Sequence, residues 1–108
     1  MVLVFVAGAG YLISRNLGGG GQARTIDVTV TGNKMTPSTL TARQGDILTI
    51  KVTADAKEEI HLHGYDIAFE VEKPGDTVTK TFKADKSGTY PIEIEETSTE
   101  LGELVVNP

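Results

Sequence analysis

Two histidines, His61 and His63, are the residues of this 108-residue chain that are best suited to chemistry. They are its only imidazoles, they lie two residues apart, and the chain contains no cysteine. On a β-strand, alternate side chains project to the same face about 7 Å apart, so two imidazoles at this spacing could bind one ion. On a helix they would diverge. The spacing predicts a metal site without thiolate, provided that this segment is a strand.

The elements that must position these histidines read as β-strands throughout, with no sustained helical period. Segments rich in Val, Ile, Thr and Tyr are Thr25–Val30, Leu40–Ala42, Ile47–Ala54, Glu59–Val71, Thr77–Lys83, Thr89–Glu95 and Leu101–Val106. Gly and Asp in the gaps between them are typical of turns. About seven strands with such turns predict an all-β, two-sheet sandwich. Thr97–Glu100 matches a capping box, which predicts one helical turn before the last strand.

The alternation of apolar residues predicts which side chains face the core. We expect the inward positions to be Ile26, Val28, Val30, Leu48, Ile50, Val52, Tyr90, Ile92 and Ile94. Their neighbours on the same strands, such as Lys51, Glu93 and Glu95, should face water. The histidines should then project side by side at the mouth of the resulting barrel.

The first thirteen residues carry no charge and would span about 20 Å as a helix, short of the roughly 30 Å hydrocarbon core of a membrane. We interpret residues 1–14 as a truncated signal-anchor or transmembrane segment, 15–24 as a flexible Gly-rich linker and 25–108 as the folded domain. The domain is then expected at the cell membrane, on the extracytoplasmic side. Arg15 and Arg24, taken alone, favour a cytoplasmic domain. A buried strand or helix is the alternative for the apolar run.

Composition excludes several classes of function. A net charge of -5 and the lack of a Lys/Arg cluster disfavour nucleic acid as a partner. The absence of cysteine removes disulfides, zinc ribbons and iron–sulfur clusters. Ser38, Ser87 and Ser98 lie in turn-like contexts without a nucleophile elbow, and Glu93 and Glu95 fit the polar face of a strand better than an acid–base pair. We therefore expect no enzyme activity.

Three stretches of the chain carry a resemblance to a known family. They are Met35-Thr-Pro37 with Leu40-Thr-Ala-Arg-Gln-Gly45-Asp46; Glu59-Ile60-His61 followed by Lys73-Pro74-Gly75; and Gly88-Thr89-Tyr90 with Gly102-Glu-Leu-Val-Val106. In order and spacing the segment from about Thr25 to Pro108 resembles the cupredoxins, Greek-key β-sandwiches that carry copper. It is similar to the copper domain of cytochrome oxidase subunit II and to small bacterial cupredoxins. A closer likeness is to exported bacterial cupredoxin-like domains that carry the His-Leu-His-Gly-Tyr-Asp string and no cysteine.

The resemblance places His61 at the family's first copper ligand and Ile94 near the position of its cysteine. A blue-copper site requires that thiolate, so blue-copper electron transfer is not expected. Glu95 follows the cysteine position, and the fold should bring it near His61 as a third ligand, with solvent as the fourth. Glu93 and Glu96 are the alternatives for this carboxylate.

Imidazole and carboxylate ligands suit copper first, by the Irving–Williams order, with zinc as the alternative. The Met35 thioether would matter only for Cu(I), and Tyr65 and Asp66 could orient an imidazole. Because both imidazoles must be neutral to bind a metal, affinity should collapse below about pH 6. The sequence thus predicts a tethered extracytoplasmic domain that binds a divalent metal and that could serve a protein partner. The alternative is a metal-free accessory or protein-interaction domain on the same scaffold.

Overall fold

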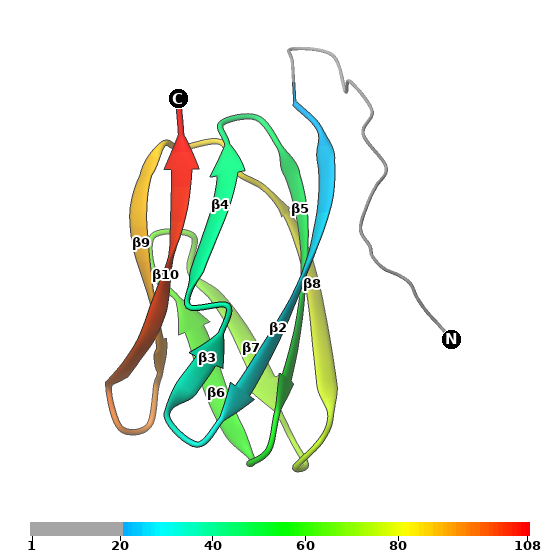
Figure 1. Cartoon of the computed structure of the whole chain (residues 1–108), viewed down its shortest axis with the longest axis vertical. Helices are drawn as coiled ribbons and strands as arrows, with labels where there is room; N and C mark the ends of the chain where they lie inside the picture. Colours follow the sequence, from blue (N-terminus) through cyan, green and yellow to red (C-terminus); the bar gives the residue numbers. More distant parts are fainter. Residues whose placement is uncertain (1–20) are drawn as a thin grey trace.

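The protein is a β-sandwich of two sheets, shown by a computed structural model that describes residues 21–108 (Figure 1). Its strands in this part of the chain are β2 (Ala23–Thr31), β3 (Lys34–Thr36), β4 (Thr39–Arg43), β5 (Ile47–Ala54), β6 (Glu58–Leu62), β7 (Ile67–Val71), β8 (Thr77–Lys83), β9 (Gly88–Ile94) and β10 (Thr99–Asn107). The order is β4-β10-β9-β6-β7 in one sheet and β3-β2-β5-β8 in the other. The predicted all-β sandwich is confirmed.

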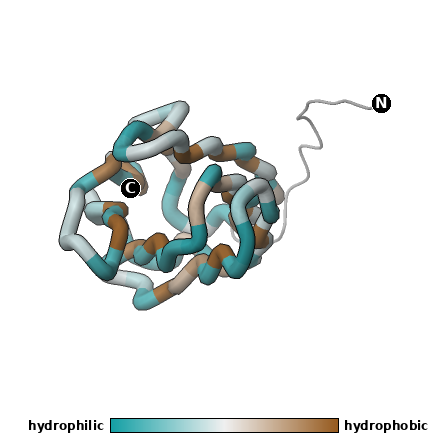
Figure 2. Tube along the Cα trace, turned by 90° about the horizontal axis from the view of Figure 1, so that it is seen from below, coloured by the Kyte–Doolittle hydropathy of each residue, from teal (hydrophilic) through white to brown (hydrophobic). Residues whose placement is uncertain are grey.

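The core lies between the sheets and is built mainly from aliphatic side chains. Hydrophobic and hydrophilic residues alternate along the strands (Figure 2), because successive side chains point to opposite faces. On β5, Leu48, Ile50 and Val52 are buried and Lys51 is exposed, as the alternation predicts. Of the other predicted inward residues, all are buried except Ile26 and Tyr90, which are half-buried against the core.

The buried carboxylate of Asp46 ties three segments together at one end of the sandwich. It accepts hydrogen bonds from the backbone N–H groups of Gln22 (3.0 Å) and Arg43 (2.9 Å), and it lies 3.7 Å from the Arg24 guanidinium. These bonds hold the start of β2 against the β4–β5 turn. Strand β2 accordingly begins at Ala23, before the Thr25 that the sequence suggested.

Two segments differ from the sequence prediction. The single strand expected over Glu59–Val71 is two strands, β6 and β7, joined by the turn His63–Asp66. Gly64 (φ 85°) and Asp66 (φ 55°) adopt left-handed backbone conformations in this turn, which a continuous strand excludes. The prediction of a helical turn at Thr97–Glu100 was wrong. Strands β9 and β10 pair directly there as a hairpin, and this pairing overrides the capping-box pattern.

Within residues 21–108 no helix is long and apolar enough to cross a membrane. The predicted anchor at residues 1–14, and the linker as far as residue 20, lie outside the described residues.

Candidate metal centre

Strand β6 presents His61 on the outer face of the five-stranded sheet. Its neighbours Ile60 and Leu62 are 1% and 0% exposed and point into the core, so the side chain between them points away from the core. Across the sheet His61 pairs with Glu93 on β9. The expected position at the mouth of the barrel was therefore wrong, because the inward positions of β6 belong to aliphatic residues.

His63 lies just beyond the end of β6, yet its ring remains beside that of His61. Its backbone N–H donates to the carbonyl oxygen of Pro91 at 3.0 Å, which keeps the chain against β9 for one further residue. The two ring centroids are 4.6 Å apart with an interplanar angle of 68°. The two imidazoles therefore form one cluster, as their spacing predicts.

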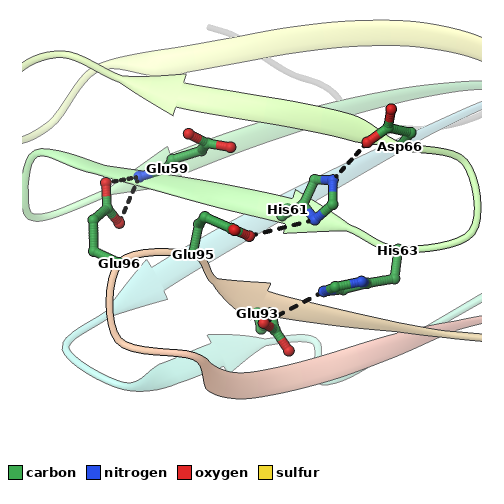
Figure 3. Close-up of polar contacts among 7 residues, drawn as sticks. All are labelled: Glu59, His61, His63, Asp66, Glu93, Glu95 and Glu96. Carbon is green, nitrogen blue, oxygen red and sulfur yellow. Dashed lines mark hydrogen bonds and ion pairs between the residues drawn. The ribbon is translucent and has the colours of Figure 1, made fainter.

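Three carboxylates surround the two imidazoles (Figure 3). Glu95 Oε1 lies 3.5 Å from His61 Nδ1, and Asp66 Oδ1 lies 3.1 Å from His61 Nε2. On the other ring, Glu93 Oε1 lies 3.4 Å from His63 Nε2. Glu93 on β9 and Glu95 directly after it alternate with the buried Ile92 and Ile94, so they reach the same outer face as His61. The backbone N–H of Glu95 still donates to the Glu59 carbonyl oxygen of β6 at 2.9 Å.

His61 Nδ1 and His63 Nε2 are buried, and neither has a hydrogen-bond partner among the described residues. The nearby oxygens of Glu95 and Glu93 are close to these nitrogens but are not aligned for hydrogen bonds. Leaving a buried polar atom unpaired costs about 1–3 kcal/mol. Two such nitrogens lie in one cluster, and a metal ion could pair with both by accepting a lone pair from each.

The distances within the cluster fit a metal ion. One ligand atom from each of His61, His63 and Glu95 lies within 4.8 Å of the others. With bonds of about 2.0–2.2 Å, two tetrahedral ligands of one ion lie roughly 3.4 Å apart, which the 3.5 Å between His61 Nδ1 and Glu95 Oε1 matches. The Glu95 side chain is 51% exposed, so its carboxylate can adjust its own distance to each imidazole.

Asp66 determines which nitrogen of His61 is available. Its carboxylate accepts a hydrogen bond from Nε2–H, and a neutral imidazole then carries its lone pair on Nδ1, toward Glu95. Carboxylates commonly orient metal-binding histidines in this way. The suggested orienting role of Asp66 is consistent with this contact.

Tyr65 does not orient an imidazole but belongs to a brace that holds the turn His63–Asp66. Its hydroxyl donates to the Lys86 carbonyl oxygen (2.8 Å), and Lys86 Nζ donates to the Gly64 carbonyl oxygen (2.8 Å). The Tyr90 ring fills the space beside Gly64, where an added Cβ would collide with the ring. The pKa of Tyr65 is raised above its ordinary value, mainly because the side chain is partly buried. Sequence patterns gave no sign of Lys86 or Tyr90 in this role.

The cluster and the two-sheet fold agree with a family comparison: the family model for the cupredoxin-like domain matches residues 2–106. The chain belongs to the cupredoxin-like family. A search of the curated proteins finds no match to this cupredoxin-like domain.

Solved structures with the same fold include several copper proteins. One is the metal-binding domain of the Cu(I)-exporting P-type ATPase CopA of Streptococcus pneumoniae, with a TM-score of 0.68, 12% identity, and coverage of 88% of this chain and 93% of that one. Another is auracyanin A, a "blue" copper protein of Chloroflexus aurantiacus, with a TM-score of 0.63, 18% identity, and coverage of 79% and 99%. A heme-copper terminal oxidase matches with a TM-score of 0.64, 16% identity, and coverage of 94% and 76%. At these identities the likeness shows a shared fold.

The remaining candidates of this cupredoxin-like domain lie apart from the cluster. Ile94, expected at the cysteine position, is 5% exposed and points into the core. Met35 is also buried in the core, inside the sandwich, whereas the histidines are on its outer face. Both oxygens of Glu96 accept from the backbone N–H of Glu59 at 3.2 Å, so this carboxylate caps the strand end. Glu95 is therefore the nearest carboxylate to His61 Nδ1, and Glu93 faces His63.

Proposed function

We propose that this cupredoxin-like domain binds one divalent metal ion, copper in preference to zinc, through His61 Nδ1, His63 Nε2 and the Glu95 carboxylate. The observation that carries this proposal is the pair of buried imidazole nitrogens without hydrogen-bond partners beside that carboxylate. Imidazole and carboxylate favour Cu(II) over Cu(I), and copper over zinc at equal supply. The copper bound by the CopA domain and carried by auracyanin A supports the choice of metal.

The proposed role is to bind and hand over the ion, with no catalysis and no blue-copper electron transfer. The chain has no cysteine to supply a thiolate, and Ile94 occupies the core instead. The uncharged residues 1–13 support a tether to the membrane, with the domain on the extracytoplasmic side. A protein partner would then deliver or receive the metal.

The test is a calorimetric titration of the 108-residue chain with Cu(II) and, separately, Zn(II). The variants are His61→Ala and His63→Ala, and Glu70→Gln on the outer face of β7 is the matched control. We expect one ion per chain, at least a hundredfold weaker binding in each histidine variant, and unchanged binding in the control. Equal weak binding in all four proteins would refute the metal site.

A metal-free accessory or interaction domain is the second candidate. The observation that favours it is the buried Ile94, which shows that the scaffold packs well with an aliphatic side chain at the expected cysteine position. Under this alternative the histidines are a half-buried pair on the sheet surface. The same titration separates the two candidates, because only the first predicts a specific loss in His61→Ala and His63→Ala.

A further inference from the structure

A groove of about 670 Å³ lies between the first residues of β7 and the last residues of β8. Each of these strands is the last in its sheet: β7 pairs only with β6, and β8 pairs only with β5, among the strands described (Figure 1). Each therefore has one edge of backbone N–H and C=O groups without a strand partner. Such an edge is a template for pairing with another extended chain.

The floor of the groove is apolar. Ile67 on β7 and Phe82 on β8 are half-buried, and the Tyr65 ring packs against Phe82 with a centroid separation of 5.1 Å. On β8, Phe82 points inward, and Lys80, two residues before it, has the same direction at the rim. The groove thus offers apolar contacts to alternate side chains of an extended segment.

The rim of the groove carries three lysines and two aspartates, one net positive charge, although the chain is acidic. Lys80, Lys83 and Lys86 all line it, which places three of the chain's ten basic residues around one groove of a protein with a net charge of -5. Two acidic residues, Asp66 and Asp85, are also in the lining. The metal centre's face of the sheet, in contrast, carries Glu59, Glu70, Glu93 and Glu95. Charge complementarity therefore favours an acidic occupant in the groove.

We infer that the groove binds an extended acidic segment of a partner protein, which adds as a strand to the free edge of β7 or β8. Main-chain hydrogen bonds to the edge would give affinity, and alternate apolar and acidic side chains would meet the floor and the lysine rim. This inference does not depend on the metal centre. A lysine on an edge strand also commonly serves only to prevent self-association, and the experiment includes that outcome.

The experiment is an amide chemical-shift titration of the 108-residue chain in EDTA, so that metal binding plays no part. The probe is a blocked heptapeptide of alternating glutamate and valine. Control peptides replace glutamate by lysine, or carry N-methyl groups on every second amide, which keeps the charge but prevents pairing. The variant Lys80→Glu/Lys83→Glu is compared with Lys34→Glu/Lys51→Glu, which changes net charge equally on β3 and β5.

We expect the acidic peptide to shift amides in β7 and β8, to bind at least tenfold more weakly to Lys80→Glu/Lys83→Glu, and to bind the control variant within twofold of the unmodified chain. Equal binding of the N-methylated peptide would overturn strand addition. Binding to phosphatidylserine vesicles that depends on the lysines, without peptide binding, would instead identify a lipid surface. That result would also overturn strand addition. Self-association of Lys80→Val without peptide binding by the unmodified chain would leave only the protective role of the lysine.

Discussion

Replacing Asp66 by Asn tests how the protein prepares His61 for a metal. The carboxylate lies 3.1 Å from His61 Nε2, and its loss removes the negative charge that makes Nδ1 a stronger ligand. The substitution should preserve the turn, because Asn tolerates the left-handed conformation of residue 66 (φ 55°) as well as Asp does. The Asn oxygen can also still accept the Nε2–H hydrogen bond. The change is therefore one of charge with little change of shape.

The structure sets the size of the expected effect. Loss of a residue that orients a metal ligand typically weakens metal binding by about 10- to 100-fold. The Asp66 side chain is 96% exposed, so solvent screens its charge, and the effect should lie near the lower limit. We expect about tenfold weaker Zn(II) binding, or about 1.4 kcal/mol. Asp66→Ala should lose more, because it also removes the hydrogen-bond acceptor.

The assay is competition for Zn(II) against a chromophoric chelator at a fixed neutral pH, with Asp76→Asn in the exposed β7–β8 turn as the control. The control should bind as the unmodified chain does. An affinity of Asp66→Asn within twofold of the unmodified chain would refute the orienting role. A loss as large as that of His61→Ala would show that Asp66 is itself a ligand.

Three further predictions concern stability. Gly64→Ala and Gly75→Ala both place a side chain at a left-handed φ (85° and 92°), which costs about 1–2 kcal/mol, but only a side chain at residue 64 also meets the Tyr90 ring. Gly64→Ala should therefore lower the unfolding midpoint in urea clearly more than Gly75→Ala. Equal losses in the two variants would exclude that steric contact. Asp46→Asn should lose about 2 kcal/mol of unfolding free energy, because a buried charged acceptor of two backbone N–H groups becomes neutral, and a loss below 0.5 kcal/mol would contradict this role. Burial raises the pKa of Glu58 above its ordinary value of 4.5, so the folded state holds this proton to higher pH than the unfolded chain does, and stability falls as the pH rises above 4.5. Glu58→Gln should remove this decline and melt at a higher temperature than the unmodified chain at neutral pH. A pH profile of stability that is unchanged in Glu58→Gln would contradict this role of Glu58.

The fold was largely predictable because most strands alternate strictly between apolar and polar residues. The predicted ranges Ile47–Ala54 and Thr77–Lys83 coincide with β5 and β8. Strand β3 was missed, because Lys34–Thr36 contains one apolar residue and is too short for any alternation to show. The turn at His63–Asp66 was missed because the β-formers on both sides outweighed the Gly and Asp within it.

The site was predictable in part. The contact between the two imidazoles follows from their spacing, whereas the proximity of Glu95 to His61 was expected only from the family resemblance. The outer-face position of the histidines could have been read from Ile60 and Leu62, whose alternation places His61 opposite the core. The brace from Lys86 and Tyr90 joins residues far apart in the sequence, and no local pattern encodes such a contact.

In the proposed centre, His61 Nδ1 and His63 Nε2 together hold one metal ion. A long-range ¹H–¹⁵N correlation spectrum of the imidazoles, recorded on the 108-residue chain with and without one equivalent of Zn(II), observes these atoms directly. We predict that the resonances of those two nitrogens shift together and stop shifting after one equivalent. Resonances that stay in place, or a shift of His61 Nε2 in place of Nδ1, would contradict the proposed centre.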